Sequence, residues 1–229
     1  MESRGISRLM EELSQQKEAF FFDMDGLLFD TETLYYETRR QILNKHGYPY
    51  TKNDHANYIG KGFDDTIYRL QKLVDDETLG QRIFDESMEL FQAEVENGNL
   101  SLKRGAVKLL TELNKNGENC YLTSSSSKKI IMQTLQVARI EEFFSGVISG
   151  EEVESNKPAP DIYLHALTIA QTSKEQAIVF EDAKSGVAAA SQAGIDVVMV
   201  PDWTPPDEED RKKTVAVVPN LHEAAALFH

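Results

Sequence analysis

Two aspartates one residue apart, Asp23 and Asp25, directly follow a run of three phenylalanines and precede Gly26. The run Phe20–Phe22 is too short for a helix and is typical of a strand buried on both faces, which Asp and Gly would end. At a separation of about 4 Å, two carboxylates repel by roughly 4 kcal/mol at an effective dielectric of about 20. Such a pair needs a cation, a shared proton or a turn that separates it, although a solvated Asp turn also fits this pattern alone.

Three further polar segments stand at or after the ends of predicted strands: Thr123–Ser126, Lys157 and Glu181-Asp182. Because the carboxyl ends of parallel strands meet at one edge of a sheet, we expect these segments to converge with Asp23 and Asp25. Four carboxylates and one lysine would be electrostatically unfavourable there as bare structure. Carboxylate oxygens are ligands that Mg²⁺ prefers, whereas the scattered histidines and single cysteine offer no zinc-type ligand set.

Each segment also has a simpler interpretation. The serines could cap the following helix, Lys157 could be an exposed loop lysine, and Glu181-Asp182 could be an ordinary acidic turn. Their joint occurrence in one chain favours a functional site over these separate explanations.

The elements that position these residues alternate between helix and strand from about residue 100 onward. Strands are predicted at 119–123, 147–149, 177–180, 195–200 and 215–218, and helices at 105–116, 128–137, 161–170, 185–193 and 221–228. This alternation predicts an α/β fold with a mainly parallel sheet and helices on both faces. The segment Pro201–Asp210 is expected to form an acidic loop.

Between the first strand and this region, residues 33–99 show apolar positions at three- and four-residue spacings and no convincing strand. We therefore expect two domains, a catalytic core of residues 1–32 and 100–229 and an inserted all-helical cap of residues 33–99. Residues 5–18 could form a short amphipathic helix before the core, and this leader could alternatively mediate assembly of a structural oligomer.

Composition narrows the class of partner. The chain has 229 residues and a net charge of −14, from 24 basic and 38 acidic residues. This balance argues against a general nucleic-acid-binding or anionic-membrane-binding surface. A small anionic substrate stays possible, because cations close to a binding site can outweigh the repulsion from the net negative charge of the whole chain. The single Cys120, the absence of a signal peptide and the absence of a long apolar run predict a cytoplasmic protein, with a monomer favoured.

The polar segments together resemble the haloacid dehalogenase-type phosphohydrolases, specifically the subgroup with a helical cap after the first motif, which includes beta-phosphoglucomutase-like phosphatases. The four matching motifs are Asp23–Glu32, Ser124 with Thr123 as the competing assignment, Lys157–Asp161 and Glu181–Gly186. The resemblance covers nearly the whole chain and implies a Rossmann-like core with an inserted cap.

The resemblance also implies roles for these residues. Asp23 would be the nucleophile that forms an aspartyl-phosphate, and Asp25 would be the general acid and then the general base. Ser124 and Ser125 would hold phosphate oxygens, and Lys157 would offset the charge on Asp23 and the phosphoryl group. Mg²⁺ would be bound by Asp23, the backbone carbonyl of Asp25 and Asp182, with Glu181 acting directly or through water.

Within this family, Asp25 favours phosphate ester chemistry, because dehalogenases resemble the pattern with a non-acidic residue there. Beta-phosphoglucomutases carry a His and an Arg where this chain has Leu34-Tyr35-Tyr36 and Gly62-Phe63-Asp64. We therefore expect hydrolysis of a small phosphorylated metabolite such as a sugar phosphate or nucleotide. A phosphosugar mutase and a non-catalytic metabolite-binding module are the alternatives. Lys61 is a candidate substrate contact, or else a solvated loop residue.

Overall fold

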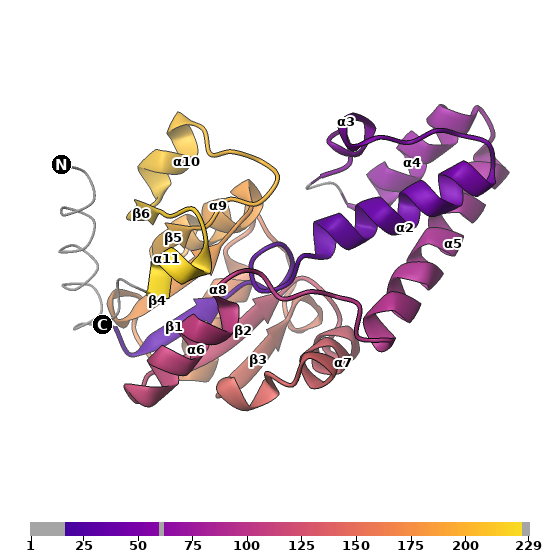
Figure 1. Ribbon diagram of the computed structural model, residues 1–229. Helices are drawn as coiled ribbons and strands as arrows, with labels where there is room; N and C mark the ends of the chain where they lie inside the picture. Colours follow the sequence, from indigo (N-terminus) through magenta and orange to yellow (C-terminus); the bar gives the residue numbers. More distant parts are fainter. Residues whose placement is uncertain (1–16, 60–61, 226–229) are drawn as a thin grey trace. The chain divides into compact units, whose positions relative to one another are not determined.

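A parallel six-stranded sheet forms the centre of the larger structural unit (Figure 1). The strand order is β3-β2-β1-β4-β5-β6, and every neighbouring pair is parallel. The strands are β1 (Ala19–Phe22), β2 (Asn119–Ser124), β3 (Gly146–Ser149), β4 (Ala177–Glu181), β5 (Asp196–Met199) and β6 (Ala216–Val217). The predicted strands are therefore confirmed, with shifts of one or two residues at some ends.

The computed structural model describes residues 17–59 and 62–225. The predicted leader helix lies outside these residues except for its last two positions, as do Lys61 and the end of the predicted last helix. The described chain divides into two compact units. One comprises the residues up to Phe29 and from Leu102 onward, and the other comprises Asp30–Ser101.

Strand β1 is central because its aromatic side chains fill both sides of the sheet. Phe20, Phe21 and Phe22 are fully buried. The ring of Phe21 lies 5.6 Å from that of Tyr121, and Phe22 stacks on Phe180 at 4.8 Å. The register pairs Phe22 with Leu122 on one side and Phe180 on the other. The next residue of each strand, including Asp23 and Glu181, is therefore at the same level of the sheet.

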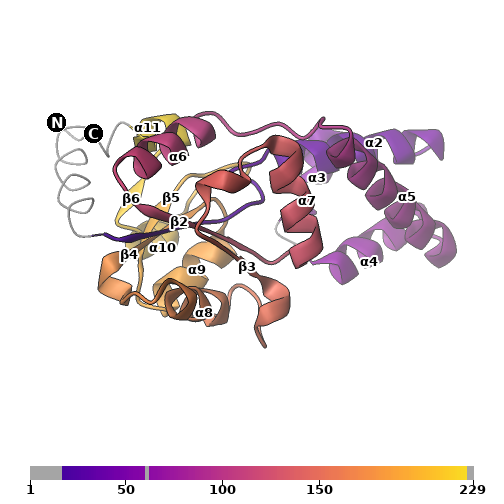
Figure 2. The ribbon, with the colours of Figure 1, turned by 90° about the horizontal axis from the view of Figure 1, so that it is seen from below.

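Helices cover both faces of the sheet, as predicted. Helices α8 (Asp161–Ala170) and α9 (Lys184–Gln192) lie on one face, where Ile162, Tyr163 and Val187 join the core around Phe21. Figure 2 shows α6 (Ala106–Lys115) and α11 (Leu221–Ala225) on the opposite face. The remaining helical elements of this unit are α7 (Lys128–Ala138) and the short 3-10 turns Glu141–Phe143, Gly150–Glu152 and Lys174–Gln176.

No helix among the described residues is long and apolar enough to cross a membrane.

The prediction of a loop throughout Pro201–Asp210 is wrong at its end, because helix α10 spans Glu208–Lys213. The Asp207 side chain accepts hydrogen bonds from the backbone N–H groups of Glu209 and Asp210, at 2.8 and 3.0 Å. The Asp210 side chain in turn accepts from the Asp207 N–H at 3.0 Å. This reciprocal cap begins a helix whose acidic first turn and basic last turn both complement the helix dipole.

The second unit is helical throughout its regular structure. Its elements are α2 (Thr31–Lys45), α3 (Lys52–His55), α4 (Phe63–Val74) and α5 (Glu77–Glu96). Helices α4 and α5 come close at Gly80, where an added Cβ would lie 2.5 Å from the backbone of Gln71. The helices predicted for residues 33–99 are thus present. The predicted division into a core and an inserted cap with these limits stays a prediction, as does the role of the cap.

Gly105 lies at the contact between α6 and α11, and Gly117, which has a similar backbone conformation but no close neighbour, serves as its control. Both Gly105 and Gly117 have positive φ, +94° and +83°, but a Cβ on Gly105 would lie 2.0 Å from the His222 backbone nitrogen, whereas one on Gly117 meets nothing within 4 Å. We expect Gly117→Ala to lower the free energy of unfolding by about 1–2 kcal/mol through backbone strain. Gly105→Ala should cost at least about 2 kcal/mol more, through overpacking.

Urea unfolding of both variants, followed by circular dichroism, measures the difference. Equal losses for the two variants would contradict the close contact of α6 with α11.

Candidate active site

Lys157 links two of the predicted site residues. Its ammonium donates to Asp23 Oδ1 at 2.5 Å and to Glu181 Oε1 at 2.6 Å, and its side chain is only 7% exposed. The Tyr163 hydroxyl donates to the same Glu181 oxygen at 2.6 Å. The Lys157 Nζ also lies 5.2 Å from the centre of the Tyr163 ring. Tyr163, which the sequence analysis missed, therefore helps to fix both partners of this ion pair.

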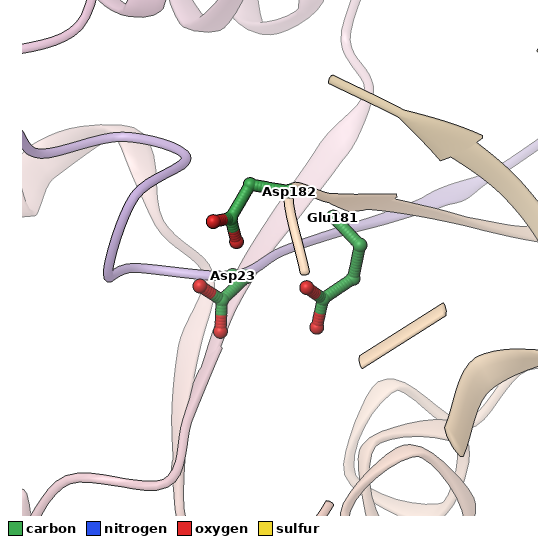
Figure 3. A group of neighbouring side chains, drawn as sticks. All are labelled: Asp23, Glu181 and Asp182. Atoms are coloured by element: carbon green, nitrogen blue, oxygen red, sulfur yellow. The ribbon is translucent and has the colours of Figure 1, made fainter. Parts of the chain in front are cut away.

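Three buried carboxylates converge on this point. Asp23, Glu181 and Asp182 each offer an oxygen within 4.8 Å of the others. Figure 3 shows the three side chains close together. Asp182 Oδ1 is buried and has no hydrogen-bond partner among the described residues. A buried carboxylate oxygen without a partner is costly, and one lysine cannot balance three carboxylates. An all-oxygen donor set with excess negative charge fits a hard divalent cation such as Mg²⁺.

The protonation of the site reflects this crowding. Burial raises the pKa of Asp23 to about 8, although Lys157 works against the shift, and Glu181 and Asp25 add to it. Burial also raises the pKa of Asp182 well above its usual range, with further contributions from Asp23, Glu181 and Asp202. For Lys157, burial favours the neutral form, but Asp23 and Glu181 more than reverse this and raise its pKa. Lys157 therefore stays charged, while the raised pKa values of Asp23 and Asp182 favour their protonated forms, whose protons a bound cation would displace.

Two glycines make room for the carboxylates. Gly26 has φ +82°, and a Cβ there would lie 2.2 Å from Asp182 Oδ2. A Cβ on Gly186 in α9 would lie 1.9 Å from the carboxyl carbon of Glu181. The atoms that Gly186 accommodates therefore belong to the site.

Asp25 occupies a different environment from Asp23. Its Oδ2 lies 3.3 Å from the Ser124 hydroxyl and 3.4 Å from the Ser126 hydroxyl. Strand β1 ends at Phe22, and the chain then turns, with the Gly26 N–H donating to the Phe29 carbonyl at 2.9 Å. The turn gives Asp23 and Asp25 separate partners, which is one of the three solutions that the sequence allowed.

Thr123 and Ser124, the two candidates for the second motif, have different surroundings. The buried Thr123 hydroxyl donates to the Phe22 carbonyl at 3.2 Å, so it joins neighbouring strands. The Ser124 hydroxyl instead faces Asp25 and accepts from the Ser126 N–H at 3.1 Å. Ser125 is exposed in the loop after β2. Ser126, which was absent from the predicted site, contacts Asp25 where Ser125 was expected to contribute. Lys61 lies outside the described residues.

Comparison with known proteins agrees with this geometry. The chain is 31% identical over 183 residues to a phosphorylated carbohydrates phosphatase of Thermotoga maritima, a match that covers 78% of this chain and 82% of the relative. It is 32% identical over 200 residues to (DL)-glycerol-3-phosphatase 2 of Arabidopsis thaliana, covering 79% and 78%. Both relatives are phosphatases.

A solved structure from Thermotoga maritima, provisionally assigned as a beta-phosphoglucomutase, matches with a TM-score of 0.77 and 28% identity over 92% of this chain and 96% of that one. The predicted Rossmann-like α/β fold and the predicted class of enzyme, a phosphoric monoester hydrolase, are confirmed. The sequence model of the haloacid dehalogenase-like hydrolase family matches residues 20–200, and the chain belongs to this family.

Proposed function

We propose that this enzyme is a Mg²⁺-dependent phosphatase that hydrolyses a small phosphorylated metabolite, with the phosphoryl group carried transiently on Asp23. The observation that carries the proposal is the position of Asp23, which contacts the Lys157 ammonium and lies in one group with the carboxylates of Glu181 and Asp182. The activities of the relatives, on phosphorylated carbohydrates and on glycerol 3-phosphate, favour a sugar phosphate or a similar small ester.

Asp23 would act as the nucleophile. In the first step, one of its carboxylate oxygens bonds to phosphorus while the bond from phosphorus to the substrate oxygen breaks. The 2.5 Å contact with Lys157 would hold the carboxylate in one orientation and keep a positive charge beside the transferring group. When bound, the divalent cation would neutralise negative charge on the carboxylates and on the phosphoryl oxygens.

Asp25 would move the protons. It would give a proton to the departing alcohol oxygen in the first step and take one from water in the second, when water attacks phosphorus and Asp23 is released. Its contacts with the hydroxyls of Ser124 and Ser126 support this assignment, because these neutral groups do not oppose a proton on the carboxyl group. Ser124 would also be available to phosphate oxygens.

Phosphate release from a panel of sugar phosphates, nucleotides and glycerol phosphates tests the proposal. With Mg²⁺ we expect turnover of at least one ester, which a chelator abolishes. Asp23→Asn should lower kcat by at least about a thousandfold, on the scale of losing a covalent nucleophile. Glu141→Gln, a change at an exposed carboxylate, should leave kcat unchanged.

Turnover that survives Asp23→Asn would contradict the covalent mechanism. Interconversion of sugar phosphates without phosphate release would favour the mutase, and Mg²⁺ binding without turnover of any panel member would favour a binding module.

The pKa of Asp23 predicts how metal affinity depends on pH. In the metal-free protein this pKa is about 8, against an ordinary value of 3.8. Below pH 8 the cation must displace a proton, so Mg²⁺ affinity should rise at least about tenfold between pH 6 and pH 8.

The raised pKa of Asp23 also affects stability, because between pH 3.8 and about pH 8 the metal-free folded protein binds more protons than the unfolded chain. Its stability should therefore fall as pH rises through this window.

Isothermal titration with Mg²⁺ at several pH values measures the first effect, and urea unfolding in chelator measures the second. In Asp23→Asn both slopes should decrease, because one titrating group is gone. A wild-type Mg²⁺ affinity that does not change between pH 6 and pH 8 would contradict this account of the site.

A further inference from the structure

Asp202 lies beside the acidic group, although it belongs to none of the four motifs. It follows β5 by three residues, and its side chain is 11% exposed. The register pairs Glu181 with Met199, and the Val200 N–H donates to the Glu181 carbonyl at 2.7 Å. The segment that carries Asp202 is therefore hydrogen-bonded to β4 up to the level of the site.

The distance from Asp202 to Asp182 is limited by Gly26. A Cβ on Gly26 would lie 2.2 Å from Asp182 Oδ2 and 3.4 Å from Asp202 Oδ2. The two carboxylate oxygens thus approach the same point on the turn and can be no farther apart than those two distances combined. Two buried carboxylates this close repel each other, so their proximity calls for a compensating charge.

Lys103 supplies part of that charge and fixes the orientation of Asp202. Its ammonium donates to Asp202 Oδ1 at 2.6 Å. Its backbone N–H donates to the Leu28 carbonyl at 2.8 Å, and the preceding residue Leu102 forms an antiparallel bridge with Phe29. Lys103 is therefore attached to the turn that carries Asp25 and Gly26. With Oδ1 bound to Lys103, Oδ2 is the oxygen on the side of Asp182.

We propose that Asp202 is a positioning residue for the metal centre, whose Oδ2 accepts a hydrogen bond from a water molecule bound to the divalent cation, with Lys103 holding it in place. This inference rests on the proposed function. Asp202 acts through water because it is outside the group of carboxylates, Asp23, Glu181 and Asp182, whose oxygens lie within 4.8 Å of one another in the described part of the chain. Partners of this kind orient metal ligands and water, and their loss typically weakens metal affinity about 10–100-fold.

The alternative is a purely structural ion pair that anchors the loop after β5. The two roles predict different results for Asp202→Asn. A structural pair would lose stability with little change in metal affinity. A positioning residue would lose metal affinity, whatever the loss of the Lys103 contact costs in stability.

Asp196→Asn is the matched control. Asp196 is the first residue of β5, the strand that Asp202 follows, so it lies at the end opposite the site, and it also pairs with a lysine, Lys17, at 2.8 Å. Since Lys17 is buried, this substitution should lower stability, but it should leave Mg²⁺ affinity unchanged.

The test is isothermal titration of the three full-length proteins with Mg²⁺, combined with urea unfolding in chelator. We expect Asp202→Asn to raise the Kd for Mg²⁺ about 10–100-fold while the metal-free variant stays folded, whereas Asp196→Asn should leave the Kd unchanged. Phosphatase activity of this variant should need proportionally more Mg²⁺ and approach the wild-type kcat at saturation.

A Kd for Asp202→Asn within twofold of the wild-type value would overturn the inference and leave the proposed function standing. Wild-type protein that binds no Mg²⁺ would overturn both. Weakened Mg²⁺ binding by the variant, together with no phosphatase activity in wild type, would support the positioning role and count against the proposed function.

Discussion

The contact on which the site depends is the buried ion pair of Lys157 with Asp23 and Glu181. Removing ionised groups from water costs several kcal/mol each, and a single buried pair recovers this only with good geometry and further hydrogen bonds. Here Lys157 contacts Asp23 at 2.5 Å and Glu181 at 2.6 Å, and Tyr163 donates to the same Glu181 oxygen. Even so, the charges do not balance, because Asp182 adds a third buried carboxylate with an unpartnered oxygen. The metal-free fold is therefore held together against an electrostatic cost, which a cation would relieve.

The sheet makes this crowding possible by bringing distant parts of the chain to one level. Parallel register at Phe22 brings Asp23, the residue after β1, to the level of Glu181 at the end of β4, although 158 positions separate them in the sequence. Fully buried aromatic side chains on β1 and β4 fix this register, since a slip by one residue would turn each of them to the opposite face. Hydrophobic packing thus stabilises a constellation that its own charges would otherwise separate.

Much of this could be predicted from sequence, because the relevant signals are local. Alternating helix and strand patterns predicted the parallel sheet, and carboxylates after short apolar runs predicted which strand ends carry the site. Asp202 and Tyr163 could not be predicted, because they reach the site through tertiary packing of a loop and a helix. The different contacts of Thr123 and Ser124 could not be predicted, because they depend on which side chains of β2 point to which face of the sheet. A shift of one residue along the strand would exchange the two faces. Helix α10 was missed because the Asp207–Asp210 cap outweighed the acidic, proline-containing context before it.

The turn that follows β1 explains how two aspartates in one short motif come to have different surroundings. Had the strand continued, Asp23 and Asp25 would point the same way and share one environment. The strand instead ends at Phe22, and Asp23 meets a lysine while Asp25 meets two serine hydroxyls. In the proposed mechanism the ammonium would favour the ionised form of Asp23, whereas neutral hydroxyls would place no positive charge against a proton on Asp25. The lack of a side chain at Gly26 then admits Asp182 beside this turn, since a Cβ there would lie 2.2 Å from Asp182 Oδ2. Any larger residue at position 26 would therefore displace a member of the acidic group, so the site depends on this glycine as well as on the carboxylates.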